Sequence, residues 1–129
     1  MTLRGIAAIS GAYDAVVGLL MLAGRPLLVA WFGVAAPAPP IHGDLNGLFL
    51  LAVALGYWLP WRDPERYRGY LWVMGPFLKG AGALLFVADH FLRGSPASYL
   101  LFALTDGTLA VVTLWALLRG VAASAASPR

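Results

Sequence analysis

Cysteine is absent from the 129-residue sequence, and lysine occurs once, at position 79. The absence of cysteine excludes a disulfide framework, a Cys-x-x-Cys redox pair, thiolate metal sites and cysteine nucleophiles. Glycine-rich phosphate loops, nucleophile elbows and Ser-His-Asp spacings are missing as well. The sequence therefore gives no support to hydrolase chemistry.

Charge is scarce too, because charged residues make up 12% of the chain whereas hydrophobic residues make up 60%. This composition lies outside the range of ordinary soluble domains and is typical of an integral membrane protein. The net charge of +3 comes with arginines at the edges of apolar runs, so it indicates neither a basic patch nor a nucleic-acid partner. The partner that the composition predicts is the lipid bilayer.

Four apolar runs are long enough to cross a bilayer, and the connections between them are short. The first run follows Arg4 as in a secretory signal, but Asp14 interrupts it, so we expect a retained span. The tail has no apolar periodicity and is predicted to be flexible. The predicted units are one transmembrane domain at 1–119, with spans at about 5–24, 44–60, 64–93 and 96–119, and a flexible tail at 120–129.

Local signals place the ends of these spans. Asp44 is well placed as the N-cap of the second span, where its carboxylate can accept from free amides of the first turn. Asp63, followed by Pro64, has the pattern of a helix start. Gly94 suits the end of a helix, and Ser95 suits the N-cap of the next one.

A short apolar stretch follows the first span. Residues 27–34 are too few to cross the membrane and include Trp31, which predicts an interfacial or partly re-entrant helix. A long, kinked continuation of the first span is the alternative. The predicted fold class is all-α, a four-transmembrane-helix up-down-up-down bundle with a short interfacial helix after span 1.

Arginines indicate the orientation of the bundle. Arg62, Arg66 and Arg68 make the connector at 61–69 the most basic one. With four spans, both termini share a side with this connector, and the positive-inside rule places that side in the cytoplasm. We predict a multi-pass protein of the bacterial inner (plasma) membrane with both termini cytoplasmic.

Lys79 lies near the middle of an apolar stretch, residues 69–92, that would reach about 36 Å as a helix. A central lysine costs about 2.5–3.5 kcal/mol on insertion scales, so it should face the bundle interior and pair with an acid. Asp14 and Asp106 lie at matching depth in other spans. We predict an intramembrane polar cluster of these three residues, serving either as a structural ion pair or as a substrate or proton site. If all three are ionised, a shared proton or a bound cation would relieve the surplus negative charge.

A second set of polar residues falls near the predicted periplasmic face, where it could form a charged, wetted vestibule or ligand-binding site. Two imidazoles and two carboxylates could coordinate a divalent metal, and His42 and His90 could ligate haem. Their spacing matches no local metal motif, so no cofactor is predicted. The members of this set are His42, Asp44, Asn46, Asp89, His90 and Tyr99.

A family resemblance rests on three segments, GDLNGLFLLAVALGY, DPERYRGYLWVMGPFLKGAGALLF and ALTDGTLAVVTLWAL. With an acidic first span, a D-P-x-R-x-R connector, a lysine in the third span and an aspartate in the fourth, the chain resembles small bacterial DoxX-like and related membrane proteins. The resemblance implies a four-helix inner-membrane fold, often an accessory subunit beside a redox or biosynthetic partner. The lack of cysteine speaks against thiol or sulfur chemistry, and no catalytic residue is carried over.

The predicted function is that of a non-enzymatic membrane protein, either an accessory subunit or a small ligand-binding bundle held together by Asp14, Lys79 and Asp106. The first alternative is a proton-coupled small-molecule transporter that acts as a dimer. The second is a haem- or metal-binding membrane redox subunit. We expect either a homo-oligomer or a membrane-protein partner, and the sequence identifies no substrate.

Overall fold

The computed structural model describes residues 2–125, and it describes the side chains of residues 2–119. This part of the chain consists of helices and their connections and contains no strand, which confirms the all-α prediction. Three of its helical segments are long and apolar enough to cross a membrane, namely Leu3–Ala23, Arg68–Arg93 and Tyr99–Arg119.

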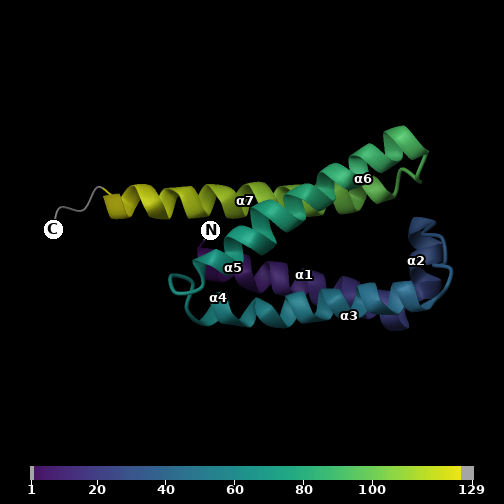
Figure 1. Cartoon of the computed structure of the whole chain (residues 1–129), viewed down its shortest axis with the longest axis horizontal. Helices are drawn as coiled ribbons and strands as arrows, with labels where there is room; N and C mark the ends of the chain where they lie inside the picture. The colour runs from purple at the N-terminus through teal and green to yellow at the C-terminus, as the bar shows by residue number, and fades with distance from the viewer. Residues whose placement is uncertain (1, 126–129) are drawn as a thin grey trace.

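The helices form two packed pairs. Helix α1 packs mainly on α3, η1 and α6 pack mainly on α7, and α1 also contacts α7. Successive long segments run in opposite directions, and the start of α1 and the end of α7 both lie toward the end with α4 and α5 (Figure 1). In chain order the elements are α1 (Leu3–Ala23), α2 (Arg25–Phe32), α3 (Ile41–Gly56), α4 (Trp58–Arg62), α5 (Arg68–Trp72), the π-helical η1 (Val73–Lys79), α6 (Gly80–Arg93) and α7 (Tyr99–Ala125).

The second predicted span differs from the structure at both ends. Helix α3 begins at Ile41 after Pro40, so the prediction of Asp44 as N-cap is wrong. Asp44 instead lies in the first turn of α3 and forms an ion pair with Arg25 at the start of α2. Helix α3 ends at Gly56, and Tyr57 separates it from α4, so this segment is not one uninterrupted helix.

The helices after the two connectors also begin later than predicted. Asp63 is not the N-cap of α5, so that prediction is wrong: its Oδ1 accepts from the Arg66 amide at 3.1 Å, but residues 64–67 form turns and α5 begins only at Arg68, after Tyr67. Helix α7 begins at Tyr99, since the Ser95 hydroxyl donates to Asp89 and caps no helix.

The end of α6 and the existence of a short helix after the first span agree with the sequence. Gly94 ends α6 in the left-handed conformation, at φ 74°, as predicted for a C-terminal glycine. A separate short helix, α2, follows the first span, and its Trp31 is 70% exposed. At the other end of the chain α7 continues past Arg119 to Ala125, and the rest of the predicted flexible tail, 126–129, lies outside the described residues.

The helix that carries Lys79 is π-helical from Val73 to Lys79 and contains Pro76. Proline has no amide hydrogen and its ring collides with the carbonyl four residues earlier, so an α-helical turn cannot accommodate it without distortion. The wider π turn accommodates the proline without ending the helix, which continues directly into α6.

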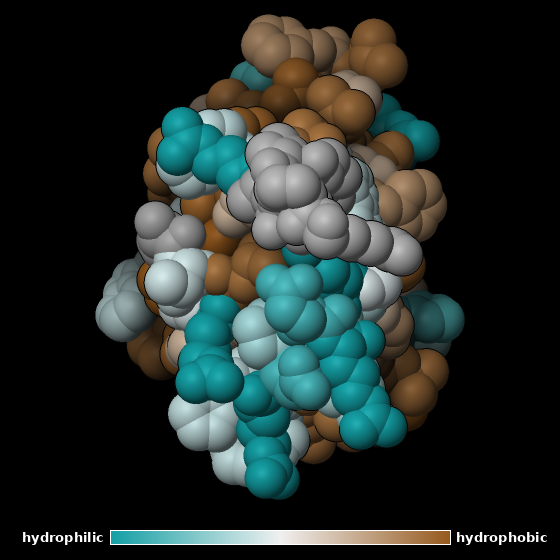
Figure 2. All heavy atoms as spheres, turned by 90° about the vertical axis from the view of Figure 1, so that its left-hand side faces the viewer, coloured by the Kyte–Doolittle hydropathy of each residue, from teal (hydrophilic) through white to brown (hydrophobic). Residues whose placement is uncertain are grey.

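A buried apolar core lies at the end of the structure that carries α4 and α5. It consists of Ala7, Val53, Tyr57, Leu71 and Leu117. Arginines join the helix ends there, because the Arg4 guanidinium donates to the Arg62 carbonyl at 3.0 Å and the Arg68 guanidinium donates to the Leu117 carbonyl at 2.7 Å. Hydrophilic residues gather on this end of the molecule, with apolar residues around them (Figure 2).

Candidate functional site

A buried ion cluster joins the two helix pairs. Lys79 Nζ donates to Asp14 Oδ1 at 2.5 Å and to Asp106 Oδ1 at 3.3 Å. The side chain of Lys79 is 5% exposed, that of Asp14 is 3% exposed and that of Asp106 is 18% exposed. The contact that the sequence predicts among these three residues is therefore confirmed, and Asp14 is the closer partner.

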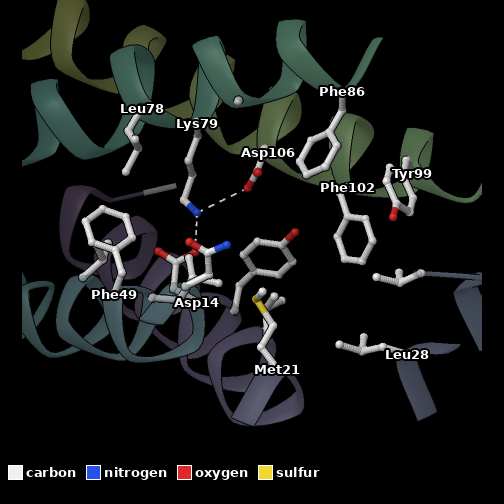
Figure 3. Close-up of a pocket in the computed structure, with 17 residues that line it drawn as sticks. Asp14, Met21, Leu28, Phe49, Leu78, Lys79, Phe86, Tyr99, Phe102 and Asp106 are labelled. Carbon is white, nitrogen blue, oxygen red and sulfur yellow. Dashed lines mark hydrogen bonds and ion pairs between the residues drawn. The ribbon is translucent and has the colours of Figure 1, made fainter. Parts of the chain in front are cut away.

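Three helices supply the cluster, one residue each. Lys79 is the last residue of η1, and it extends toward α1, where Asp14 meets it near the middle of that helix. Asp106 projects from α7, which packs on η1 and α6, so Asp106 and Lys79 come from the same helix pair and their side chains converge (Figure 3). Close packing supports the geometry, because a Cβ at Gly75 would lie 2.6 Å from Thr113 Cγ2.

Tyr13 extends the cluster toward α7. Its ring lies 4.8 Å from Lys79 Nζ, measured to the ring centroid, which is within the range of a cation–π contact. Its hydroxyl and the Thr105 hydroxyl lie 2.8 Å apart and share a hydrogen bond. Tyr13 therefore contacts the lysine and at the same time links α1 to α7.

A cavity of about 410 Å³ lies beside the cluster, between the two helix pairs. Every long helix contributes to its wall, and α2 covers part of it through Leu28. Figure 3 shows the rings of Phe86, Phe102 and Tyr99 on one side of the ion cluster and the ring of Phe49 on the other. The lining residues are Tyr13, Asp14, Val17, Met21, Leu28, Val34, Asn46, Phe49, Leu50, Val53, Leu78, Lys79, Gly82, Phe86, Tyr99, Phe102 and Asp106.

Aromatic side chains of α6 and α7 form a continuous wall of this cavity. Phe86 stacks on Phe102 with ring centroids 5.7 Å apart, and Tyr99 meets Phe86 edge-on at 6.0 Å. Phe102 also contacts Phe32 at the end of α2, at 5.5 Å. Because the Ser98 hydroxyl donates to the Phe32 carbonyl, α2 is attached to α7 at this end of the cavity.

Of the predicted vestibule residues, two line the cavity and the others do not. Asn46 and Tyr99 are part of its wall. Asp44 is paired with Arg25, and Asp89 is paired with Arg93 at 2.9 Å. The structure thus divides a set that the sequence treats as one group.

The two histidines are not part of a metal centre in the described residues. His90 Nδ1 donates to the Ser95 carbonyl at 2.6 Å, and His42 is exposed. No group of three or more His, Cys, Asp or Glu residues within the described part of the chain is placed to hold a metal ion. The ion pairs of Asp44 and Asp89 occupy the carboxylates that would complete such a group.

Several cavity residues escape a sequence reading that looks for charge. Met21 shares the Asp14 face of its helix, and Phe86 and Phe102 share the faces of Lys79 and Asp106, so helical projection finds them. The α3 wall is also periodic, since Asn46, Phe49, Leu50 and Val53 follow the i, i+3, i+4, i+7 spacing of one helix face. Tyr13 carries no such signal, because it is the chain neighbour of Asp14.

Relatives give no further information on this site. The chain matches no protein-family model, no curated protein and no solved structure. The role of the cavity and its ion cluster therefore follows from their own residues.

Proposed function

We propose that this protein is a non-enzymatic four-helix integral membrane protein that binds a small, mostly apolar molecule between its two helix pairs. One observation carries the proposal: a cavity of about 410 Å³ lies against the buried Asp14 and Lys79 and the partly buried Asp106. Small-molecule sites are usually clefts of about 300–1,000 Å³ with apolar and aromatic walls and a few polar groups. This cavity has that size and that lining.

In this proposal α3 and α4 together form the second of the four spans, the one in addition to the three long apolar helical segments. Residues 41–62 are helical apart from Tyr57, whose φ of −64° and ψ of −14° keep the chain close to its helical direction. At about 1.5 Å per residue this segment measures about 33 Å, which exceeds a hydrocarbon core of about 30 Å. Four antiparallel spans, with α2 as a short additional helix, form the proposed up-down-up-down bundle.

The charge distribution supports an orientation with both termini in the cytoplasm of a bacterial cell. The opposite end of the bundle carries Arg25 and Arg93, both paired with acids. Positively charged residues are enriched on the cytoplasmic side of inner-membrane proteins. The described arginines at the α4–α5 end are Arg4, Arg62, Arg66, Arg68 and Arg119.

The absence of cysteine makes the orientation simple to test. Two variants each introduce one cysteine: Glu65→Cys in the connector between α4 and α5, and Ala35→Cys in the connector between α2 and α3. A membrane-impermeant maleimide should label Ala35→Cys in intact spheroplasts and Glu65→Cys only after lysis. The reverse pattern would overturn the orientation, and labelling of both in intact spheroplasts would overturn the four-span arrangement.

Two neighbouring valines test whether a ligand occupies the cavity. Val17 lines the cavity, whereas Val16 is 57% exposed on the outer surface of α1. We expect neopentylbenzene to raise the unfolding temperature of the wild type, because a ligand that binds only the folded state stabilises it. Val17→Trp should abolish this shift by filling the cavity, and Val16→Trp should retain it. Equal shifts in both variants would show that the probe binds elsewhere.

A proton-coupled transporter is a second candidate, which one observation favours. Asp14 Oδ2 and the hydroxyl groups of Ser10 and Tyr57 are buried and lack a hydrogen-bond partner among the described residues. Buried acceptors without partners are costly, and a transferred proton could satisfy the carboxylate. In proteoliposomes, pH-driven movement of a substrate should then stop in Asp14→Asn, whereas unchanged movement would dismiss this candidate.

Two further predictions concern partners and cofactors. The DoxX-like resemblance favours an accessory subunit, and isolation in native nanodiscs should then retain a second membrane protein in fixed ratio. A homo-oligomer should give twice or more the protomer mass instead.

A redox subunit should show a Soret band or bound metal in the purified protein, and the loss of that signal in the double variant His42→Ala, His90→Ala would assign the ligands.

A further inference from the structure

The charges of the ion cluster do not balance. One ammonium group at Lys79 faces two carboxylates, at Asp14 and Asp106, so the fully ionised cluster carries one surplus negative charge. Its members are between 3% and 18% exposed, so water compensates this charge poorly. The cluster therefore favours one additional positive charge nearby.

Both carboxylates have acceptor capacity left. Asp14 Oδ2 is buried without a hydrogen-bond partner in the described residues, although Asp14 lines the cavity. Asp106 accepts one bond, from Lys79, and that bond is long at 3.3 Å. Among the described residues that line the cavity, Lys79 is the one positively charged side chain. A second cation in the cavity would thus lie near two carboxylates with unused acceptor capacity, and the one lysine nearby is already paired with them.

The remaining wall suits a positive charge on an apolar body. Five aromatic rings line the cavity, and they belong to Tyr13, Phe49, Phe86, Tyr99 and Phe102. The face of an aromatic ring attracts cations, and the attraction grows when water is excluded. Lys79 Nζ already makes such a contact with Tyr13 at 4.8 Å. Figure 3 shows the ring of Phe86 beside Asp106, with the ring of Phe102 next to it.

We propose that the ligand of this cavity is a monovalent organic cation with an apolar body, such as a hydrophobic amine or quaternary ammonium compound. This inference rests on the proposed function, because it requires that the cavity binds a small molecule at all. The apolar body would occupy the space between Met21, Phe86 and Phe102. The positive charge would lie toward Asp106 and neutralise the cluster.

A pair of isosteric probes isolates the charge. Benzyltrimethylammonium and neopentylbenzene have the same shape, but only the first carries a positive charge, and neither can donate a hydrogen bond. Binding is measured in phosphatidylcholine nanodiscs, whose zwitterionic lipid does not concentrate the cation. We expect the cation to bind the wild type about tenfold or more tightly than its neutral isostere. Phenylmethanesulfonate, an anion of similar size, should bind more weakly than either.

Matched variants locate the effect. Asp106→Asn should reduce the preference for the cation about tenfold or more, because it removes the surplus negative charge, while binding of neopentylbenzene should remain and report an intact cavity. Glu65→Gln removes the same charge from the exposed α4–α5 connector, and it should keep the full preference. If Asp106→Asn does not fold, the ratio of the two affinities in the wild type still decides the question.

The outcomes separate this inference from the proposed function. Equal binding of cation and neutral isostere, both abolished by Val17→Trp, would overturn the cation and leave a neutral-ligand site. Such a result would also indicate that a proton already balances the cluster. Binding of both probes that survives Val17→Trp would overturn the proposed function itself. A cation preference that survives Asp106→Asn would overturn the assignment of Asp106 as its counter-charge.

Discussion

The two halves of this bundle differ in packing although the same helices run through both. In the half with α4 and α5, Ala7, Val53, Tyr57, Leu71 and Leu117 form a buried apolar core, and the hollow of about 290 Å³ beside Ala7 and Tyr57 is a shallow groove open to the surface. In the other half, a partly open cavity of about 410 Å³ lies between the helix pairs. The ion cluster lies at the border between the halves.

The halves differ in what lies between the two helix pairs. Glycines bring α1 and α3 close together, since a Cβ at Gly18 would lie 2.9 Å from the Gly47 carbonyl oxygen. In the half that contains the cavity, the rings of Phe86, Tyr99 and Phe102 line the space between the two helix pairs, and α2 lies at the end of that space. The comparison shows how a cavity can form between two helix pairs: the ion cluster joins the pairs, and on one side of the cluster the pairs are farther apart.

The largest effect should come from the lysine at the border. Lys79→Met leaves two carboxylates buried without a cation, and breaking a buried ion pair in this way typically costs about 3–5 kcal/mol. We expect a loss of that size in the free energy of unfolding, measured by denaturant titration in detergent.

Second-site variants sharpen this prediction. Asp14→Asn should recover more of the loss in Lys79→Met than Asp106→Asn does, because Asp14 lies at 2.5 Å and is more deeply buried. If neither double variant is more stable than Lys79→Met, the cluster does not stabilise the border.

An effect of intermediate size is expected when a leucine is truncated to alanine in each half. Leu71 is fully buried in the half with α4 and α5, so Leu71→Ala should lower the free energy of unfolding by about 2 kcal/mol. Leu50 faces the cavity, and Leu50→Ala should cost less than about 1 kcal/mol because few packed atoms lose contacts. Equal losses would contradict the difference in packing between the halves.

The smallest effect concerns the glycine contact between α1 and α3. Gly18→Ala introduces a methyl group into a closed contact, and we expect a loss of about 1–2 kcal/mol by overpacking. Gly69→Ala is the matched control, since nothing lies within 4 Å of a Cβ there. That control should be neutral or slightly stabilising, as alanine favours a helix over glycine. Thermal unfolding of both variants in detergent compares the two positions.

The helical fold and the ion cluster could be predicted from the sequence, because long apolar runs with a lone lysine inside one of them leave few arrangements. A lysine at mid-span must find an acid, and two acids lie at its depth, which is why the contact of Lys79 with Asp14 and Asp106 could be predicted. Helix starts were harder to predict, since other partners compete with local capping. Asp44 forms an ion pair with Arg25, and the Ser95 hydroxyl donates to Asp89, so neither side chain caps a helix.

The cavity could not be predicted, because it depends on the distance between helix pairs rather than on any one pattern. Helical projection places Phe86 beside Lys79 and Phe102 beside Asp106, but it cannot tell a packed face from the wall of a space. The pairing of Asp89 with Arg93 is a local contact of the i, i+4 kind, and it removed one acid from the predicted vestibule.

The π-helical turn before Lys79 also sets the angular phase of everything that follows it. Such a turn accommodates one residue more than an α-helical turn, so the direction of each later side chain depends on that extra residue. Removing a single residue between Val73 and Leu78 would let the segment return to α-helical winding, which advances by about 100° per residue. Lys79 and the aromatic wall of α6 both follow this turn, so they would rotate together relative to Leu71 in the buried core and would no longer face Asp14.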